Sequence, residues 1–227
     1  MNSASEARRA GREPLSARAK ISAALNLLIA LAALCSWCVM VFHIDESGRL
    51  SASGLASLKY FTVLSNLLIA AAGAVWAVQL LRGRTGRRAL VLKYAGTVSV
   101  TLTFMTVMVF LGPLFGYAAM FMGGNLYLHL VVPLAALAGF LFLCREGVLE
   151  KRDARWATLP MLLYGIWYIE NNLITGHGAW PNTNDFYGFF TWGDGGAALI
   201  AVIMVTGTWG MARLIRFLRA RLIGARG

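Results

Sequence analysis

Long apolar runs, each about as long as a bilayer is thick, are the feature that most limits what this chain can fold into. A helix that crosses the hydrocarbon core needs about 20 mostly apolar residues. Of the 227 residues, 58% are hydrophobic and only 14% are charged. The sequence therefore predicts an all-α polytopic membrane protein, a bundle of six transmembrane helices. The predicted spans are residues 20–43, 57–81, 89–112, 124–144, 155–174 and 190–214.

The remaining parts of the chain are short and basic. Residues 1–19 form a polar, arginine-rich arm that we expect to be disordered, residues 20–217 form the membrane domain, and residues 218–227 form a basic cytoplasmic tail. In a soluble protein, a net charge of +11 would suggest nucleic acid binding. Here the basic residues flank apolar runs without any nucleic-acid-binding motif, so we expect no nucleic acid partner.

The distribution of lysine and arginine predicts the orientation of the bundle. Nineteen of the 21 lysines and arginines lie in the arm, between the second and third spans, between the fourth and fifth spans, in the tail, or at the adjoining helix ends. Only Arg49 and Lys59 fall on the other side. Cytoplasmic loops carry the excess of positive charge. We therefore expect a multi-pass protein with both termini in the cytoplasm, in the inner (plasma) membrane if bacterial.

This topology brings polar side chains of several spans to one level, the outer third of the bundle. Thr62, Ser65 and Asn66 share one stripe of the second span, because residues three and four apart lie on the same helix face. Asn125 and His129 are related in the same way in the fourth span. At a similar level, Glu170 and Asn171 end the fifth span and Asp194 begins the sixth.

The fourth span also contains a break in helical hydrogen bonding. Pro133 has no N–H group, so the carbonyl of His129, four residues earlier, is predicted to lose its helical donor. A carbonyl in hydrocarbon needs a partner from protein or water. The sequence thus places a titratable ring beside a local break in the helix.

Thr62 and His129 have the chemistry of a nucleophile and its base. A threonine hydroxyl needs a base within about 2.6–3.2 Å, and an imidazole with an ordinary pKa of about 6.5 suits that task. A lipid held at this level would present its ester near the head groups, which predicts hydrolysis or transfer of an acyl ester. The supporting or substrate-binding candidates are Ser65, Asn66, Asn125, Glu170, Asn171 and Asp194, with Glu170 or Asp194 orienting the ring and Asn66 or Asn125 donating to an oxyanion.

Two short stretches resemble the hallmark segments of a six-helix membrane family. They are residues 60–66, Tyr-Phe-Thr-Val-Leu-Ser-Asn, and residues 128–133, Leu-His-Leu-Val-Val-Pro. The family includes bacterial membrane proteins of unassigned function and, more distantly, the androgen-induced membrane hydrolases of animals. The resemblance covers roughly residues 57–210. It implies cleavage of fatty acid esters of hydroxy fatty acids, with Thr62 as nucleophile and His129 as base.

Other functions fit parts of the same pattern. A non-enzymatic binder of a lipid or small molecule, or a transporter component, would use the polar layer without a covalent step. A haem protein would use His43 and His129 as axial ligands, although six-helix haem proteins usually supply more histidines. The three cysteines, Cys35, Cys38 and Cys144, lie in or beside apolar runs and are expected to be small apolar fillers. We expect no metal and no cofactor.

Overall fold

The computed structural model describes residues 15–42, 54–178 and 183–224, and these residues form helices and no β-strand. The long helices are α2 (Ala17–Phe42), α3 (Phe61–Leu81), α4 (Arg87–Thr106), α9 (Asp153–Thr175) and α10 (Gly193–Gly224). Shorter elements connect or extend them: η1 (Gly54–Lys59), η2 (Val107–Leu111), α5 (Gly112–Phe115), α6 (Tyr117–Met120), α7 (Gly124–Leu126), η3 (Tyr127–Val131), α8 (Val132–Ala138), η4 (Gly139–Leu143) and η5 (Phe189–Trp192).

Among the described residues, five helical segments are long and apolar enough to cross a membrane. They are Ala17–Phe42, Phe61–Leu81, Arg87–Phe115, Gly124–Leu143 and Phe189–Gly224. The all-α character is confirmed, and these five segments overlap five of the six predicted spans. The remaining predicted span corresponds to α9, which has 23 residues but carries Asp153, Arg155 and Glu170 and is not among the five. The count of six and the orientation therefore stay predictions.

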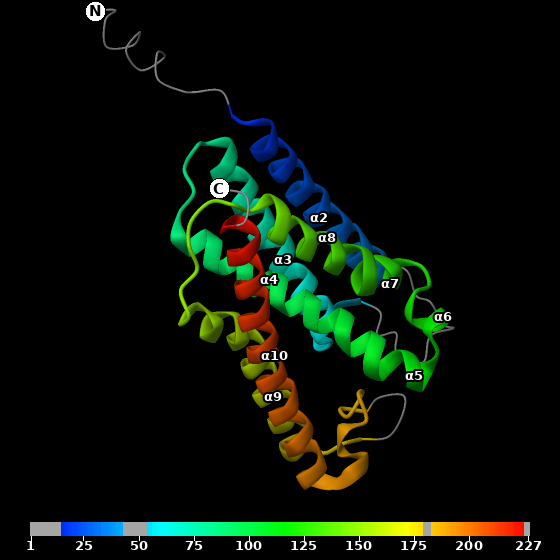
Figure 1. Ribbon diagram of the computed structural model, residues 1–227. Helices are drawn as coiled ribbons and strands as arrows, with labels where there is room; N and C mark the ends of the chain where they lie inside the picture. Colours follow the sequence, from blue (N-terminus) through cyan, green and yellow to red (C-terminus); the bar gives the residue numbers. More distant parts are fainter. Residues whose placement is uncertain (1–14, 43–53, 179–182, 225–227) are drawn as a thin grey trace, which may run out of the picture.

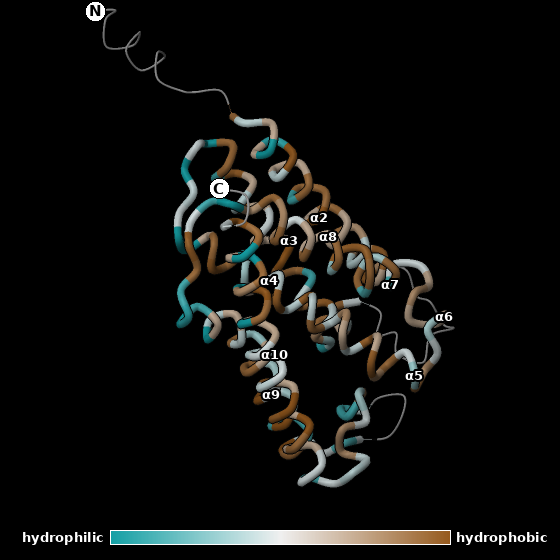
Figure 2. Tube along the Cα trace, viewed as in Figure 1, coloured by the Kyte–Doolittle hydropathy of each residue, from teal (hydrophilic) through white to brown (hydrophobic). Residues whose placement is uncertain are grey.

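The helices lie side by side in one bundle (Figure 1). The start of α2 and the end of α10 lie at the same end of the bundle, which we call the basic end (Figure 1). Hydrophilic residues gather in the connections at that end, whereas the helices are mostly hydrophobic along their length (Figure 2). The opposite end, formed by η1, α6 and residues 183–192, is called the distal end. Helix α10 continues to Gly224, through most of the range assigned to the tail.

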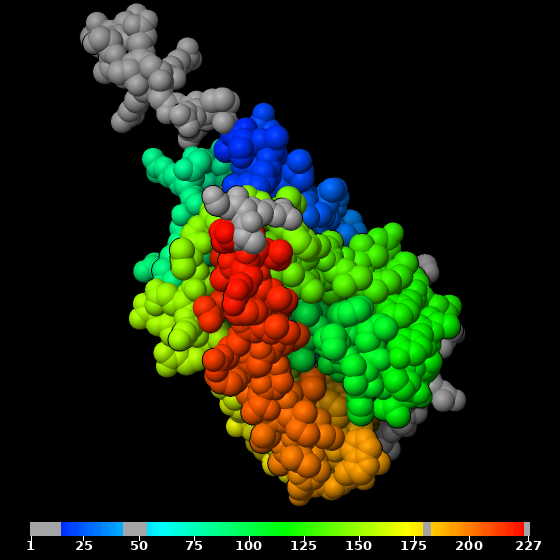
Figure 3. All heavy atoms as spheres, in the orientation of Figure 1, coloured from blue at the N-terminus to red at the C-terminus, as the bar shows by residue number. Residues whose placement is uncertain are grey.

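Much of the apolar surface of helix α10 is left uncovered by the other described residues. The helix runs across one face of the molecule in the space-filling view (Figure 3), and Leu199, Val202 and Ile203 on it are exposed. In water such a surface would favour aggregation. In a bilayer it faces lipid at no cost, which agrees with the membrane character of the fold.

Two arginines fix the first and last helices to the end of η4. Arg219, on α10, is 3% exposed, and its guanidinium donates hydrogen bonds to the carbonyls of Cys144 (2.9 Å) and Glu146 (3.0 Å). Arg18, on α2, donates to the carbonyl of Leu143 (3.1 Å). The last carbonyls of a helix have no donor of their own. These two side chains therefore satisfy them and close the basic end of the bundle.

Lys93 lies inside the bundle, not in a basic cluster at a helix end as the sequence predicted. The sequence assigned it to a basic cluster at a helix end, but its side chain is only 1% exposed and its ammonium donates a hydrogen bond to the side-chain oxygen of Asn26 on α2. Asn26 in turn donates to the carbonyl of Ser22 (2.6 Å). Gly73 on α3 makes room, since a Cβ there would lie 3.2 Å from the Asn26 carbonyl oxygen. A polar contact between α2 and α4 therefore lies inside the bundle.

Candidate functional site

The predicted polar stripe of the second span connects three helical segments. The side-chain amide of Asn66 donates to the carbonyl of Thr62 (2.8 Å) within α3 and to the carbonyl of Leu128 (3.0 Å) in η3. The Ser65 hydroxyl lies 3.0 Å from the Thr62 carbonyl oxygen and 2.9 Å from the Thr103 hydroxyl on α4. Ser65 and Asn66 thus act as bridges between helices, a common use of polar residues in membrane bundles.

The break predicted at Pro133 takes the form of a π-helical turn. In η3 the N–H of Val132 donates to the carbonyl of Tyr127, five residues earlier. In that register the carbonyl opposite the nitrogen of Pro133 belongs to Leu128, not to His129 as predicted. Asn66 supplies the donor that proline lacks. The carbonyl without a helical donor is therefore that of Leu128, one residue before the predicted His129. The difference arises because a π-helical turn adds one residue to each hydrogen-bonded ring.

His129 is held by the backbone of the segment that precedes it. The ring is 7% exposed, and its Nδ1 lies 2.7 Å from the carbonyl oxygen of Met120. Because a carbonyl only accepts, Nδ1 carries a hydrogen, and in the neutral ring Nε2 is the basic atom. Among the described residues, no hydrogen bond joins His129 to Thr62. Glu170 and Asp194 are exposed on α9 and α10, so neither orients the ring and Met120 does so instead.

The two remaining candidates lie apart from this network. Asn125 is partly buried in α7, and Asn171 is partly buried near the end of α9, where its backbone carbonyl accepts a hydrogen bond from Thr175. In the described part of the chain, no side-chain hydrogen bond connects either asparagine to Thr62 or His129. The structure therefore brings together Thr62, Ser65 and Asn66, but it does not gather all eight predicted residues into one site.

Thr62 lines a small cavity of about 30 Å³. A space of that size accommodates about one water molecule. The Tyr187 hydroxyl, also in the lining, accepts a hydrogen bond from the backbone N–H of Phe61 (3.1 Å), and burial raises the pKa of Tyr187 to about 12. The lining residues are Phe61, Thr62, Thr103, Thr106, Leu111, Met161, Tyr164, Tyr187, Phe189 and Met204.

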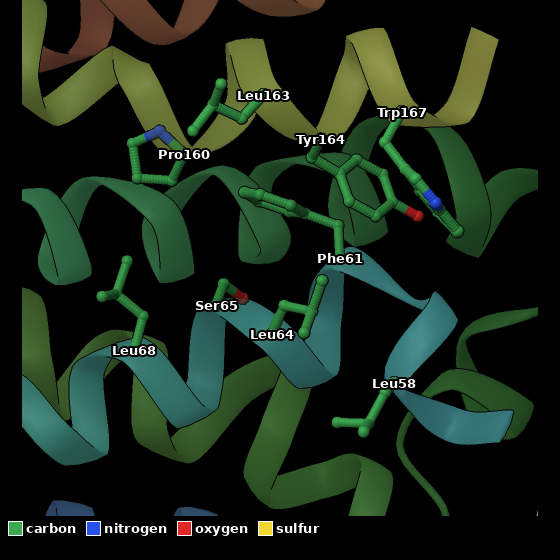
Figure 4. A pocket seen from close by; sticks show the side chains of 9 residues that line it. All are labelled: Leu58, Phe61, Leu64, Ser65, Leu68, Pro160, Leu163, Tyr164 and Trp167. Atoms are coloured by element: carbon green, nitrogen blue, oxygen red, sulfur yellow. The ribbon is translucent and has the colours of Figure 1, made fainter. Parts of the chain in front are cut away.

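A much larger groove of about 450 Å³ lies between α3 and α9 (Figure 4). Its wall is almost entirely apolar, and its two hydroxyl groups already have protein partners: Ser65 as described, and Tyr164, which donates to the carbonyl of Lys59 (2.7 Å). The lining residues are Leu58, Phe61, Leu64, Ser65, Leu68, Pro160, Leu163, Tyr164 and Trp167. The sequence did not predict this groove, because α3 and α9 are not neighbours along the chain.

Polar contacts hold residues 183–192 against the distal end of α9. The Tyr168 hydroxyl donates to the Asp185 carboxylate (2.5 Å), whose other oxygen accepts from the backbone N–H of Phe190 (3.0 Å). The Asn172 amide donates to the carbonyl of Asn184 (3.1 Å). These contacts fix Tyr187 beside Thr62. Asp185 was not among the predicted site residues, although it is an acidic residue within an aromatic-rich connection.

Comparison with protein-family models, with curated proteins and with solved structures gave no match for this chain. The resemblance to the six-helix family therefore stays a prediction. In the described ranges, no three side chains of His, Cys, Asp or Glu are grouped as a metal site requires. His43, the second ligand in the haem alternative, lies outside the described residues.

Proposed function

We propose that this protein spans the membrane six times, with both termini in the cytoplasm, and binds the acyl chain of a lipid in the groove between α3 and α9. The groove itself carries the proposal, since its volume of about 450 Å³ falls within the range of about 300–1,000 Å³ that is typical of small-molecule sites. Such sites are mostly apolar, and an acyl chain is the apolar ligand that a membrane supplies in greatest amount.

The proposed topology rests on the 19-to-2 distribution of basic residues, with α9 as the fifth of the six spans. A reporter fused after Gly227 is expected to be cytoplasmic, and one inserted at Asn182 is expected to be external. Finding both reporters on the same side would contradict the six-span topology.

The groove is open on the side that faces lipid. Leu64, Leu163 and Trp167 in its wall are 38%, 58% and 41% exposed, so a chain can enter sideways from the bilayer. In the proposed orientation Leu58 and Trp167 lie towards the outer head groups, and Leu68 and Pro160 lie deeper. An acyl chain would therefore lie along α3 with its methyl end towards Leu68.

Filling the groove tests this function. Leu163→Trp places an indole in the groove, whereas Leu162→Trp adds the same side chain at a neighbouring exposed position of α9 that does not line it. We expect native mass spectrometry of the detergent-solubilised protein to detect one retained lipid in the wild type and in Leu162→Trp, and much less in Leu163→Trp. Equal retention by the two variants would contradict a site in this groove.

Hydrolysis of an acyl ester is a second candidate, favoured by the position of Thr62 beside the groove. The cavity that Thr62 lines shares Phe61 and Tyr164 with the groove. In this mechanism the Thr62 oxygen attacks the ester carbonyl carbon and His129 Nε2 takes the hydroxyl proton. The alcohol leaves with that proton, and water then hydrolyses the acyl-threonine. Because no hydrogen bond joins the two described side chains, the ring must first approach Thr62.

An assay with long-chain acyl esters separates the two candidates. A hydrolase should lose its activity in Thr62→Ala and in His129→Gln, and the double variant should be no less active than either single one, because the two residues act as a unit. Thr62→Ser should retain part of the activity. If the wild type retains a lipid but cleaves no ester, binding without catalysis is the function.

A further inference from the structure

A lysine, Lys59, lies next to the end of the groove that Leu58 lines, although it is not itself a lining residue. Lys59 follows Leu58, which lines the groove, and its carbonyl accepts the hydrogen bond from Tyr164, which lines the opposite wall. The backbone of Lys59 is thereby fixed at the groove's end, and a flexible four-carbon stem carries the ammonium from there. In the proposed topology this end of α3 lies at the level of the outer head groups.

The Lys59 ammonium has aromatic neighbours but no acidic partner among the described residues. It lies 5.0 Å from the ring centre of Phe186 and 5.5 Å from that of Tyr60, and none of the ion pairs between described residues includes it. Burial lowers the pKa of Lys59, because partial loss of water disfavours its charged form. A nearby anion would restore the lost stabilisation of the ammonium.

We infer that the lipid held in the groove has an anionic head group, a phosphate or a carboxylate, which binds Lys59. This inference rests on the proposed acyl-chain site and adds the chemical class of its ligand. The groove wall offers no unpartnered hydroxyl, so it suits an apolar acyl chain. Lys59, next to the end of the groove, suits the negative charge of the head group. The groove and Lys59 together are complementary to a ligand that is apolar along its length and negatively charged at one end.

A second copy of this chain is the competing occupant, because an apolar helix can also cover an apolar groove. An apolar helix carries no negative charge to place at Lys59, whereas an anionic lipid carries one in its head group. We therefore favour the lipid, and contact between copies becomes one of the results that the experiment distinguishes.

Photo-labelling with three lipids that carry the same diazirine-bearing acyl chain but different head groups tests the inference. The full-length protein in neutral nanodiscs is irradiated with a diazirine-bearing phosphatidylglycerol, fatty acid or phosphatidylcholine, and peptides from α3 and α9 are analysed by mass spectrometry. We expect one or both anionic probes to label the groove about two- to five-fold more than the neutral one, the range of an exposed ion pair. The stronger anionic probe identifies phosphate or carboxylate as the preferred group.

Two variants at Lys59 and one control variant at a distant lysine assign this preference to Lys59. Lys59→Gln should reduce labelling by the anionic probes to the level of the neutral probe, Lys59→Arg should retain the preference, and Lys151→Gln, at the basic end, should leave it unchanged. Equal labelling by all three probes in the wild type, or a preference that survives in Lys59→Gln, would overturn the inference while leaving the acyl-chain site standing. No groove labelling by any probe, or cross-linking between copies instead, would overturn both.

Discussion

The side-chain amide of Asn66 on α3 donates a hydrogen bond of 3.0 Å to the backbone carbonyl of Leu128. This contact joins the two segments that carry Thr62 and His129. Its partner is the carbonyl that Pro133 leaves without a donor in the π-helical register of η3. The contact therefore repairs the break that proline introduces, and it fixes the spacing between α3 and the fourth span.

This relationship predicts that Asn66 and Pro133 are energetically coupled. Asn66→Leu should lower the free energy of unfolding by about 1–3 kcal/mol, because it leaves a buried carbonyl without a donor. In a Pro133→Ala background the backbone N–H of residue 133 is restored, and Asn66→Leu should cost less. Thermal unfolding of the four proteins in one detergent measures the coupling. Equal costs in the two backgrounds would show that the Leu128 carbonyl does not depend on Asn66.

The buried contact between Lys93 and Asn26 predicts that a double variant at these two positions is more stable than one of the single variants. Asn26→Leu leaves an ammonium buried without an acceptor and should be strongly destabilising, by about 3–5 kcal/mol, as for other buried charges that lose a partner. Lys93→Met removes the charge and should cost less. The double variant should be more stable than Asn26→Leu alone. An Asn26→Leu protein as stable as Lys93→Met, in the same unfolding assay, would contradict a charged Lys93.

Cys144 should be unreactive in the native protein. It is fully buried, and burial raises the pKa of its thiol to about 11, although Arg219 opposes that shift. In a Cys35→Ser/Cys38→Ser background, we expect no labelling by maleimide at pH 8 until the protein is unfolded in sodium dodecyl sulfate. Labelling of the native protein at the rate of the unfolded one would contradict the packing of the basic end around Cys144.

The same thiol gives a dependence of stability on pH with a defined sign. The pKa of Cys144 is higher in the folded protein than its ordinary value of 9.0, so the unfolded chain releases the proton first as pH rises. Its contribution to stability is complete below about pH 9 and is lost as pH rises towards 11. Cys144→Ala should flatten the fall in unfolding temperature over this window, compared with the parent measured in the same buffers. An unchanged slope would assign the pH dependence to other groups.

The sequence predicted the helices well because apolar runs and their basic ends are local signals. The predicted span 57–81 is Phe61–Leu81 in the structure, preceded by η1, and 155–174 is Asp153–Thr175. The break near Pro133 was also a local signal. Its register was not predictable, because the donor to the Leu128 carbonyl is Asn66, which lies 62 residues before Leu128 in the chain.

The candidate site was predicted less well, because its geometry depends on contacts between distant segments. Matching depth made Ser65 and Asn66 candidates for binding a substrate, but depth does not define which face of a helix a residue occupies. In the structure their side chains contact the Thr103 hydroxyl and the Leu128 carbonyl. His129 thus meets the Met120 carbonyl, where the sequence suggested Thr62 or a carboxylate as its partner. The groove between α3 and α9 and the buried position of Lys93 follow from helix packing, which periodicity alone does not determine.

An experimental structure of the protein in lipid nanodiscs tests most directly the claim that the groove holds an acyl chain. We expect continuous density for one chain between α3 and α9, running from Leu68 to Leu58, with the head group beside Lys59. The Leu163→Trp protein, solved in the same lipid, should lack that density. A wild-type groove filled by its own side chains or by a helix of a second copy, with no density for an acyl chain, would contradict an acyl-chain site between α3 and α9.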